Sequence, residues 1–103
     1  MALAGTKRTL EDTVKIGIIG DYNPTKRSHA ATMAALQHAA RGLGIELEVH
    51  WLPTESLLAP DTGDRLRMFA GLWAAPGSPY RSEEGAHEGI RFAREQDWPF
   101  IGT

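Results

Sequence analysis

Two stretches of this sequence place polar groups directly after apolar runs, where they could take part in chemistry. Asp21, Tyr22 and Asn23 follow an Ile-rich run, and His29 comes within two helical turns of them. The segment Pro76–Tyr80, with the sequence PGSPY, follows a second apolar run. If both runs are parallel strands, their carboxyl ends share one edge of a sheet, where open α/β sheets bind ligands. We therefore expect a ligand site at this edge.

Each of these features also has a plainer interpretation. PGSPY can be a simple strand-to-helix turn, and His29 can be a satisfied histidine in the core stripe or first turn of a helix. The remaining histidines are expected on solvated faces: His38, His50 and His87. Acidic residues around His87 could suggest a metal site, but a solvated helix start with Glu83, Glu84 and Glu88 is the preferred interpretation, and no metal is expected.

The apolar patterns predict four strands. Val14–Gly20 is nearly all apolar, which is typical of a central parallel strand covered on both faces. Glu46–Leu52 alternates strictly between polar and apolar residues, which favours a half-exposed strand at a sheet edge. Two shorter runs, Gly71–Ala75 and Trp98–Gly102, complete the set. The order predicts two β-α-β units and an open parallel sheet with strand order 2-1-3-4.

Helices are expected between these strands. One runs from Thr25 or Lys26 to Arg41, closed by Gly42 or Gly44. Its sheet-facing stripe consists of His29, Met33, Leu36, Ala40 and Leu43. Ser82 can N-cap a second helix that extends to about Gln96. Residues 53–70 form a connector in which a short helix is expected near Asp64–Phe69.

Composition limits the class of protein. The chain has 103 residues and a formal charge of −2, so a nucleic-acid partner has no electrostatic support. It has no cysteine, which excludes disulfides, thiolate metal sites and a cysteine nucleophile within these residues. No apolar run approaches the roughly 18 residues of a membrane span. Residues 1–13 lack the apolar core of a signal peptide, so we expect a flexible leader and a cytoplasmic protein.

The predicted strands and the loops that follow them, taken in chain order, resemble the first half of a class I glutamine amidotransferase domain of the CTP synthase type. Lys15–Tyr22 matches a first strand of the type KIGIVGKY, and Pro76–Tyr80 stands where the family has a PGGFG loop. Pro99–Gly102 matches its strand PFLG. The resemblance covers residues 14–103 and implies a flavodoxin-like fold. It also implies a part in glutamine hydrolysis, with the ammonia used in pyrimidine nucleotide synthesis.

By this resemblance, the backbone N–H groups of Gly77 and Ser78 face the developing oxyanion. Pro79 and Tyr80 line the glutamine pocket, with Asp21, Tyr22, Asn23 and His29 at its rim. L-Glutamine is therefore the expected ligand, and no cofactor is expected. The loop departs from the family pattern, because Ser78 replaces the second glycine and Pro79 has no N–H to donate. A positive φ angle at Ser78 would also be costly.

In the family, the catalytic cysteine comes directly after the position that Thr103 occupies, and its His and Glu partners lie further downstream. We therefore expect the 103-residue chain to be inactive as a glutaminase by itself. One explanation for a sequence that stops directly before the expected nucleophile is a UGA codon for selenocysteine after Thr103. The alternatives are a chain break at a modified residue and a deliberate truncation.

Other classes of function remain open. The chain could be a non-catalytic α/β module that self-associates or binds a ligand. The segment GDYNPTKRSHAAT is superficially similar to the nucleotide-binding G-x-F-N-P…H-x-G-H loop of adenylyltransferases, but the H-x-G-H half is missing.

The strand Trp98–Gly102 carries no charge that would protect an open sheet edge. We expect a homodimer in which two such strands pair antiparallel across a two-fold axis. Trp98, Phe100 and the apolar parts of Ile90 and Ala93 are expected at or near that interface.

Overall fold

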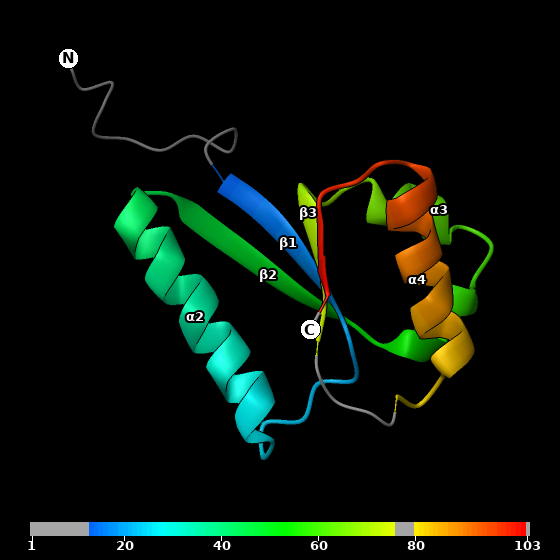
Figure 1. Cartoon of the computed structure of the whole chain (residues 1–103), viewed down its shortest axis with the longest axis horizontal. Helices are drawn as coiled ribbons and strands as arrows, with labels where there is room; N and C mark the ends of the chain where they lie inside the picture. The colour runs from blue at the N-terminus through cyan, green and yellow to red at the C-terminus, as the bar shows by residue number, and fades with distance from the viewer. Residues whose placement is uncertain (1–12, 76–79, 103) are drawn as a thin grey trace.

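The computed structural model describes residues 13–75 and 80–102, which form one open sheet with helices on both faces (Figure 1). Gly77, Ser78 and Pro79, for which the sequence predicts roles in a ligand site, lie outside the described residues. The elements, in chain order, are β1 (Thr13–Ile19), α2 (Arg27–Leu43), β2 (Glu46–Leu52), η2 (Thr54–Leu58), α3 (Thr62–Leu66), β3 (Gly71–Ala74), α4 (Glu83–Glu95) and β4 (Phe100–Gly102).

All strands of the sheet are parallel, and their order is β2-β1-β3-β4, which confirms the order predicted from the sequence. β1 lies inside the sheet, where Ile16 pairs with Val49 of β2 on one side and Gly71 of β3 on the other. Its Ile-rich sequence suits this place, because both of its faces are covered and Ile18 and Ile19 are fully buried. β2 forms an edge and alternates between exposed and half-buried residues, as its sequence pattern predicts.

The helices of the two β-α-β units, α2 and α4, cover opposite faces of the sheet (Figure 1). β2 lies on one side of β1 and β4 lies beyond β3 on the other. Right-handed crossovers therefore place α2 on one face and α4 on the other. α3 and η2 lie beside α4.

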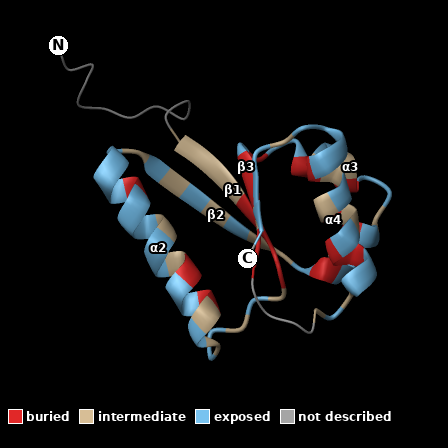
Figure 2. Ribbon diagram, viewed as in Figure 1, coloured by how far each residue is buried: buried red, intermediate tan, exposed pale blue. Residues whose placement is uncertain are grey.

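The main core lies between the sheet and α4, where buried residues gather (Figure 2). It combines Ile19 of β1 and Leu72 of β3 with Leu57 of η2, Leu66 of α3 and Ala86 of α4. α4 approaches the sheet closely at Gly89, where an added Cβ would lie 2.7 Å from Cδ1 of Ile19. Ala93 is also buried in this core, so it offers almost no surface of its own to a dimer interface.

The ends of the helices agree with the sequence signals in most places. Gly44 ends α2 in the left-handed conformation, with a φ angle of 67°, as glycine permits at this position. Ser82 caps α4, and Gln96 is its last cap residue. Leu43 is 73% exposed, so its place in the sheet-facing stripe was wrong. The helix ends there and the chain turns back into β2, so Leu43 has no sheet residue to pack against.

The connector differs more from the prediction. Its short α-helix begins and ends earlier than Asp64–Phe69, at Thr62 and Leu66, and η2 precedes it. The strand expected from Trp98 begins at Phe100, because Asp97 turns the chain with a φ angle of 54° and the N–H of Trp98 donates to Ala93 O. None of the helices in the described ranges is long and apolar enough to cross a membrane.

Candidate functional site

Asp21, the second residue after β1, joins three segments at the carboxyl edge of the sheet. Its Oδ1 accepts a hydrogen bond from the backbone N–H of Thr54 at 2.9 Å, and its Oδ2 accepts one from the Thr54 hydroxyl at 2.8 Å. The backbone N–H of Arg81 also donates to Oδ2, at 2.8 Å. One carboxylate therefore connects the end of β1 with the start of η2 and with the residues that lead into α4.

Thr54 extends this connection to α4. Its hydroxyl oxygen, which donates to Asp21, accepts a hydrogen bond from the backbone N–H of Ser82 at 2.9 Å. The Ser82 hydroxyl in turn accepts from the N–H of Gly85 at 2.9 Å, which satisfies one free donor of the first turn of α4. Thr54 is 0% exposed, so none of these bonds competes with water at that side chain. We call Asp21, Thr54, Arg81 and Ser82 the Asp21 network.

The Asp21 carboxyl has a pKa below its usual value. Partial burial by itself would raise the pKa, but the hydrogen bonds from Arg81 and Thr54 and the charge of Arg81 outweigh burial. The carboxylate is therefore ionised at neutral pH, which is the form that accepts all three hydrogen bonds.

Tyr80 connects the two ends of the segment that carries residues 76–79. Its hydroxyl donates to the carbonyl oxygen of Ala75 at 2.8 Å, and its ring packs against the core. Burial and the nearby charge of Asp21 both raise the pKa of the Tyr80 hydroxyl. Tyr80 therefore remains a neutral hydrogen-bond donor at physiological pH.

The other predicted rim residues form a separate cluster on the α2 side. The backbone N–H of Asn23 donates to Nδ1 of His29 at 2.9 Å, and the Asn23 side chain accepts from the N–H of Thr25 at 3.0 Å. The rings of Tyr22 and His29 lie 4.8 Å and 4.7 Å from that of Trp51, between ring centres. His29 is 2% exposed, so it is a partnered residue in the packed start of α2.

The structure thus joins Asp21 to Arg81, the residue after Tyr80, and groups Tyr22, Asn23 and His29 elsewhere. Sequence reasoning missed Thr54 and Arg81. Thr54 follows β2 at the same sheet edge, so its position after a predicted strand was a signal that could have found it. Nothing in the local sequence marked Arg81, because it contributes its backbone N–H to the carboxylate.

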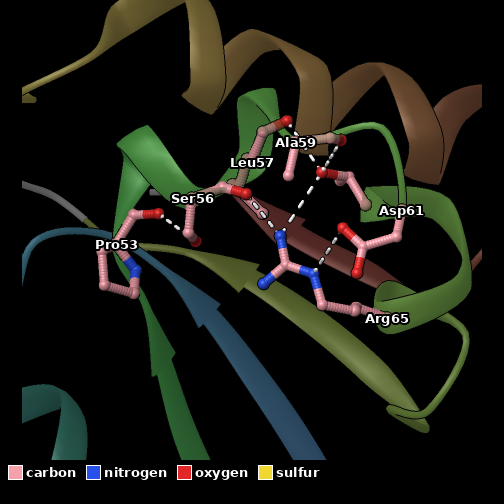
Figure 3. Close-up of polar contacts among 7 residues, drawn as sticks. Pro53, Ser56, Leu57, Ala59, Asp61 and Arg65 are labelled. Carbon is pink, nitrogen blue, oxygen red and sulfur yellow. Dashed lines mark hydrogen bonds and ion pairs between the residues drawn. The ribbon is translucent and has the colours of Figure 1, made fainter.

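A polar cluster stabilises the connector that carries Thr54 (Figure 3). The Arg65 guanidinium donates to Ser56 O, and its Nε lies 3.5 Å from Oδ1 of Asp61. Thr62 Oγ1 donates to the carbonyl oxygen of Ala59 at 2.7 Å. These bonds join η2 to α3 and give the connector a defined shape.

The described residues offer hydrogen-bond donors and acceptors at this edge of the sheet. No group of His, Asp or Glu side chains within residues 13–75 and 80–102 is arranged to hold a metal ion. The short contact of 2.5 Å between Nε2 of His50 and Oε2 of Glu48 lies in the exposed edge strand β2, away from the Asp21 network. The arrangement is suited to positioning the loop between β3 and α4.

The chain is similar in sequence to CTP synthases over most of its length. It is 32% identical to the CTP synthase of Geobacillus kaustophilus over 101 residues, which are 98% of this chain and 19% of that relative. It is 37% identical to the CTP synthase of Acidobacterium capsulatum over 89 residues, 86% of this chain and 16% of the relative. The chain therefore spans less than a fifth of the length of these relatives. No family model matches it.

Its fold also has a counterpart among solved structures. The glutaminase domain of Trypanosoma brucei CTP synthase, solved with bound acivicin, superposes with a TM-score of 0.72 at 19% sequence identity. The match covers 86% of this chain and 35% of that chain. The sequence similarity shows homology to CTP synthases, and the structural match shows a shared fold. This chain is homologous to one segment of the CTP synthases, and it has the fold of part of a CTP synthase glutaminase domain.

Proposed function

We propose that this domain binds L-glutamine at the carboxyl edge of its sheet, as part of a glutamine amidotransferase-like unit that supplies ammonia in pyrimidine nucleotide metabolism. The observation that carries the proposal is the β3–loop–α4 unit in a chain homologous to CTP synthases. Both ends of its loop are hydrogen-bonded: Tyr80 donates to Ala75 O, and Asp21 accepts from Arg81 N–H.

Within this site we assign roles by the family resemblance. The N–H groups of Gly77 and Ser78 would stabilise the negative charge on the oxygen of the attacked amide. Pro79 and Tyr80 would line the pocket for the glutamine side chain. Asp21 accepts from the N–H of Arg81, the residue after Tyr80, and would contribute to the site by positioning this segment.

Glutamine binding can be tested on the 103-residue protein by isothermal titration. We expect saturable binding of L-glutamine and much weaker binding of D-glutamine and L-glutamate. Tyr80→Phe removes the hydrogen bond to Ala75 but keeps the ring, and should weaken binding by roughly fivefold, the effect of about one neutral hydrogen bond. His38→Ala, on an exposed face of α2, is the matched control. Absence of any L-glutamine signal from folded wild-type protein would contradict the proposal.

We further propose that these 103 residues do not hydrolyse glutamine by themselves. The reaction needs an activated nucleophile and a base, and the sequence has no cysteine. The expected result is no ammonia release above the buffer rate at saturating glutamine, measured with a coupled glutamate dehydrogenase assay. Release that increases in proportion to protein concentration would show that the chain is a complete glutaminase.

For the oligomeric state of this chain, we propose a homodimer through β4. β4 pairs with β3 on one side only among the described residues, and Phe100 and Ile101 are 37% and 56% exposed. An apolar hollow of about 310 Å³ lies beside it, lined by residues such as Leu36, Trp73 and Pro99. An open apolar edge favours pairing with a second copy.

Light scattering at tens of micromolar protein tests this proposal. We expect a dimer for the wild type and a shift toward monomer for Ile101→Lys. Leu43→Lys changes an even more exposed leucine, at the end of α2, and should leave the dimer intact. A wild-type protein that is monomeric at this concentration would exclude the dimer.

A further inference from the structure

The residues that follow loop 76–79 are connected to the end of β1 through a single carboxylate. Asp21 accepts from the N–H of Arg81, which is 60 positions away in sequence, and from both donors of Thr54, which is 33 positions away. Each segment reaches Asp21 from a different strand end. Loss of this carboxylate would therefore release the start of η2 and the approach to α4 from β1 together.

Thr54 transmits the effect of Asp21 to α4. Its hydroxyl has one proton, which it donates to Asp21, so its oxygen is free to accept from Ser82 N–H. The Thr54 carbonyl oxygen lies against Gly85, where an added Cβ would be only 1.8 Å away. The first turn of α4 is therefore positioned by a residue whose hydroxyl direction depends on Asp21.

Two ionisable groups face Asp21 across this junction. The Arg81 side chain favours the charged carboxylate, and Tyr80 lies close enough for the Asp21 charge to oppose ionisation of its hydroxyl. An asparagine at position 21 has nearly the same shape, but its N–H₂ group would face at least one of the three donors. Asp21→Asn therefore tests the acceptor chemistry with little change in volume.

We propose that Asp21 is a positioning residue for the ligand site: through Thr54 and Arg81 it sets the orientation of Tyr80 and of the first turn of α4. This inference rests on the proposed glutamine site, because Tyr80 is assigned to the glutamine pocket there. Asp21 makes no contact with the ligand in this proposal and acts through its hydrogen-bond donors.

The test combines amide hydrogen exchange by NMR with glutamine titration of the 103-residue protein. Asp21→Asn should speed exchange of the Thr54, Arg81 and Ser82 amides by roughly tenfold or more, the effect of losing about one hydrogen bond to a charged group. Amides of the β1–β2 ladder should keep their wild-type exchange rates. The dissociation constant for L-glutamine should increase by a similar factor.

Thr54→Val and Thr54→Ser form the matched pair if Asp21→Asn does not fold. Valine removes the hydroxyl that accepts from Ser82, so it should speed exchange of the Ser82 amide and weaken binding, whereas serine keeps the hydroxyl and should retain wild-type exchange and binding. Asp64→Asn, on an exposed part of α3, controls for loss of one negative charge and should change neither. The NMR chemical shift of the Arg81 amide gives a further test. It should change with pH in the acidic range in the wild type, because Asp21 becomes protonated there, but not in Asp21→Asn.

The outcomes separate this inference from the proposed function. If the wild type binds no glutamine, the proposed function fails, while exchange at Thr54, Arg81 and Ser82 still decides whether Asp21 positions these residues. If the wild type binds glutamine but Asp21→Asn leaves its affinity unchanged, the positioning role is refuted. Faster exchange throughout the sheet would also refute it, since that indicates a general loss of stability.

Discussion

Gly85 and Thr54 are in such close contact that an added Cβ at Gly85 would lie 1.8 Å from the Thr54 carbonyl oxygen and 2.7 Å from its carbonyl carbon. The neighbouring group is backbone, which cannot move aside as the end of a flexible side chain can. The first turn of α4 therefore packs directly on the first residue of η2. This contact places the Ser82 cap within reach of the Thr54 hydroxyl.

Gly85→Ala should destabilise the protein strongly, because α4 or η2 must shift to admit the methyl group. We expect a loss of roughly 3 kcal/mol or more in the free energy of unfolding, measured by urea denaturation followed by circular dichroism. Gly42→Ala is the control, since a Cβ there meets nothing within 4 Å. Alanine in this exposed helical position should stabilise α2 by up to about 1 kcal/mol. Equal effects at the two positions would contradict the close contact.

Protonation of the Asp21 carboxylate should make the protein less stable at low pH. Its pKa is lowered in the folded protein from an ordinary value of 3.8, against the effect of burial, by hydrogen bonds from Arg81 and Thr54. A carboxyl group whose pKa is lower in the folded than in the unfolded protein stabilises the fold fully at pH values above its unfolded pKa. This contribution to the free energy of unfolding is lost as the pH falls through the folded pKa.

The measurement compares the wild type with Asp21→Asn in urea denaturation at several pH values. The variant should be less stable by about 2 kcal/mol at neutral pH, the magnitude for hydrogen bonds to a charged group. The difference should stay constant down to near the unfolded pKa and shrink at lower pH. Glu48 also has a lowered pKa, caused first by its hydrogen bond with His50, and both proteins share that contribution. A difference that grows on acidification would have the wrong sign.

Ser82→Ala should remove the side-chain cap of α4, because the Ser82 hydroxyl accepts from the N–H of Gly85. The expected loss is about 1 kcal/mol in the free energy of unfolding. Ser28→Ala, in the first turn of α2, is the comparison, since α2 has no side-chain cap. Thermal denaturation of both variants should show a clearly lower midpoint for Ser82→Ala only. Ser82→Asp should restore the midpoint, because aspartate is also a good cap.

His29 should contribute to stability through its ring nitrogen and its packing. It accepts from the N–H of Asn23 and lies against Trp51, so His29→Ala leaves a half-buried donor without its partner. We expect a loss of roughly 1–3 kcal/mol in urea denaturation. His38→Ala, on an exposed face of the same helix, should change stability by less than about 0.5 kcal/mol. A large loss of glutamine affinity without a loss of stability would instead assign His29 to the ligand site.

Several features of this protein were readable from the sequence because they depend on local chemistry. The period of the apolar residues separated the buried strand β1 from the edge strand β2, and the right-handed crossover rule then gave the strand order. Ser82 marked one helix end, and the sequence offered Gly42 or Gly44 for another, of which the structure uses Gly44. The PGSPY loop was expected at a ligand site because it follows a strand at the carboxyl edge of the sheet, and the family resemblance added glutamine as the expected ligand.

The sequence by itself therefore determined the elements, their order and the edge of the sheet at which a site should lie. Only the tertiary structure decided which of the polar residues at that edge meet. Asp21 joins Thr54 and Arg81, while Asn23 and Tyr22 join His29, although all the predicted rim residues follow the same strand. The physical reason is that a carboxylate bonds whichever backbone N–H groups the folded chain brings near it, and donors 33 and 60 positions away leave no periodic signal in the sequence.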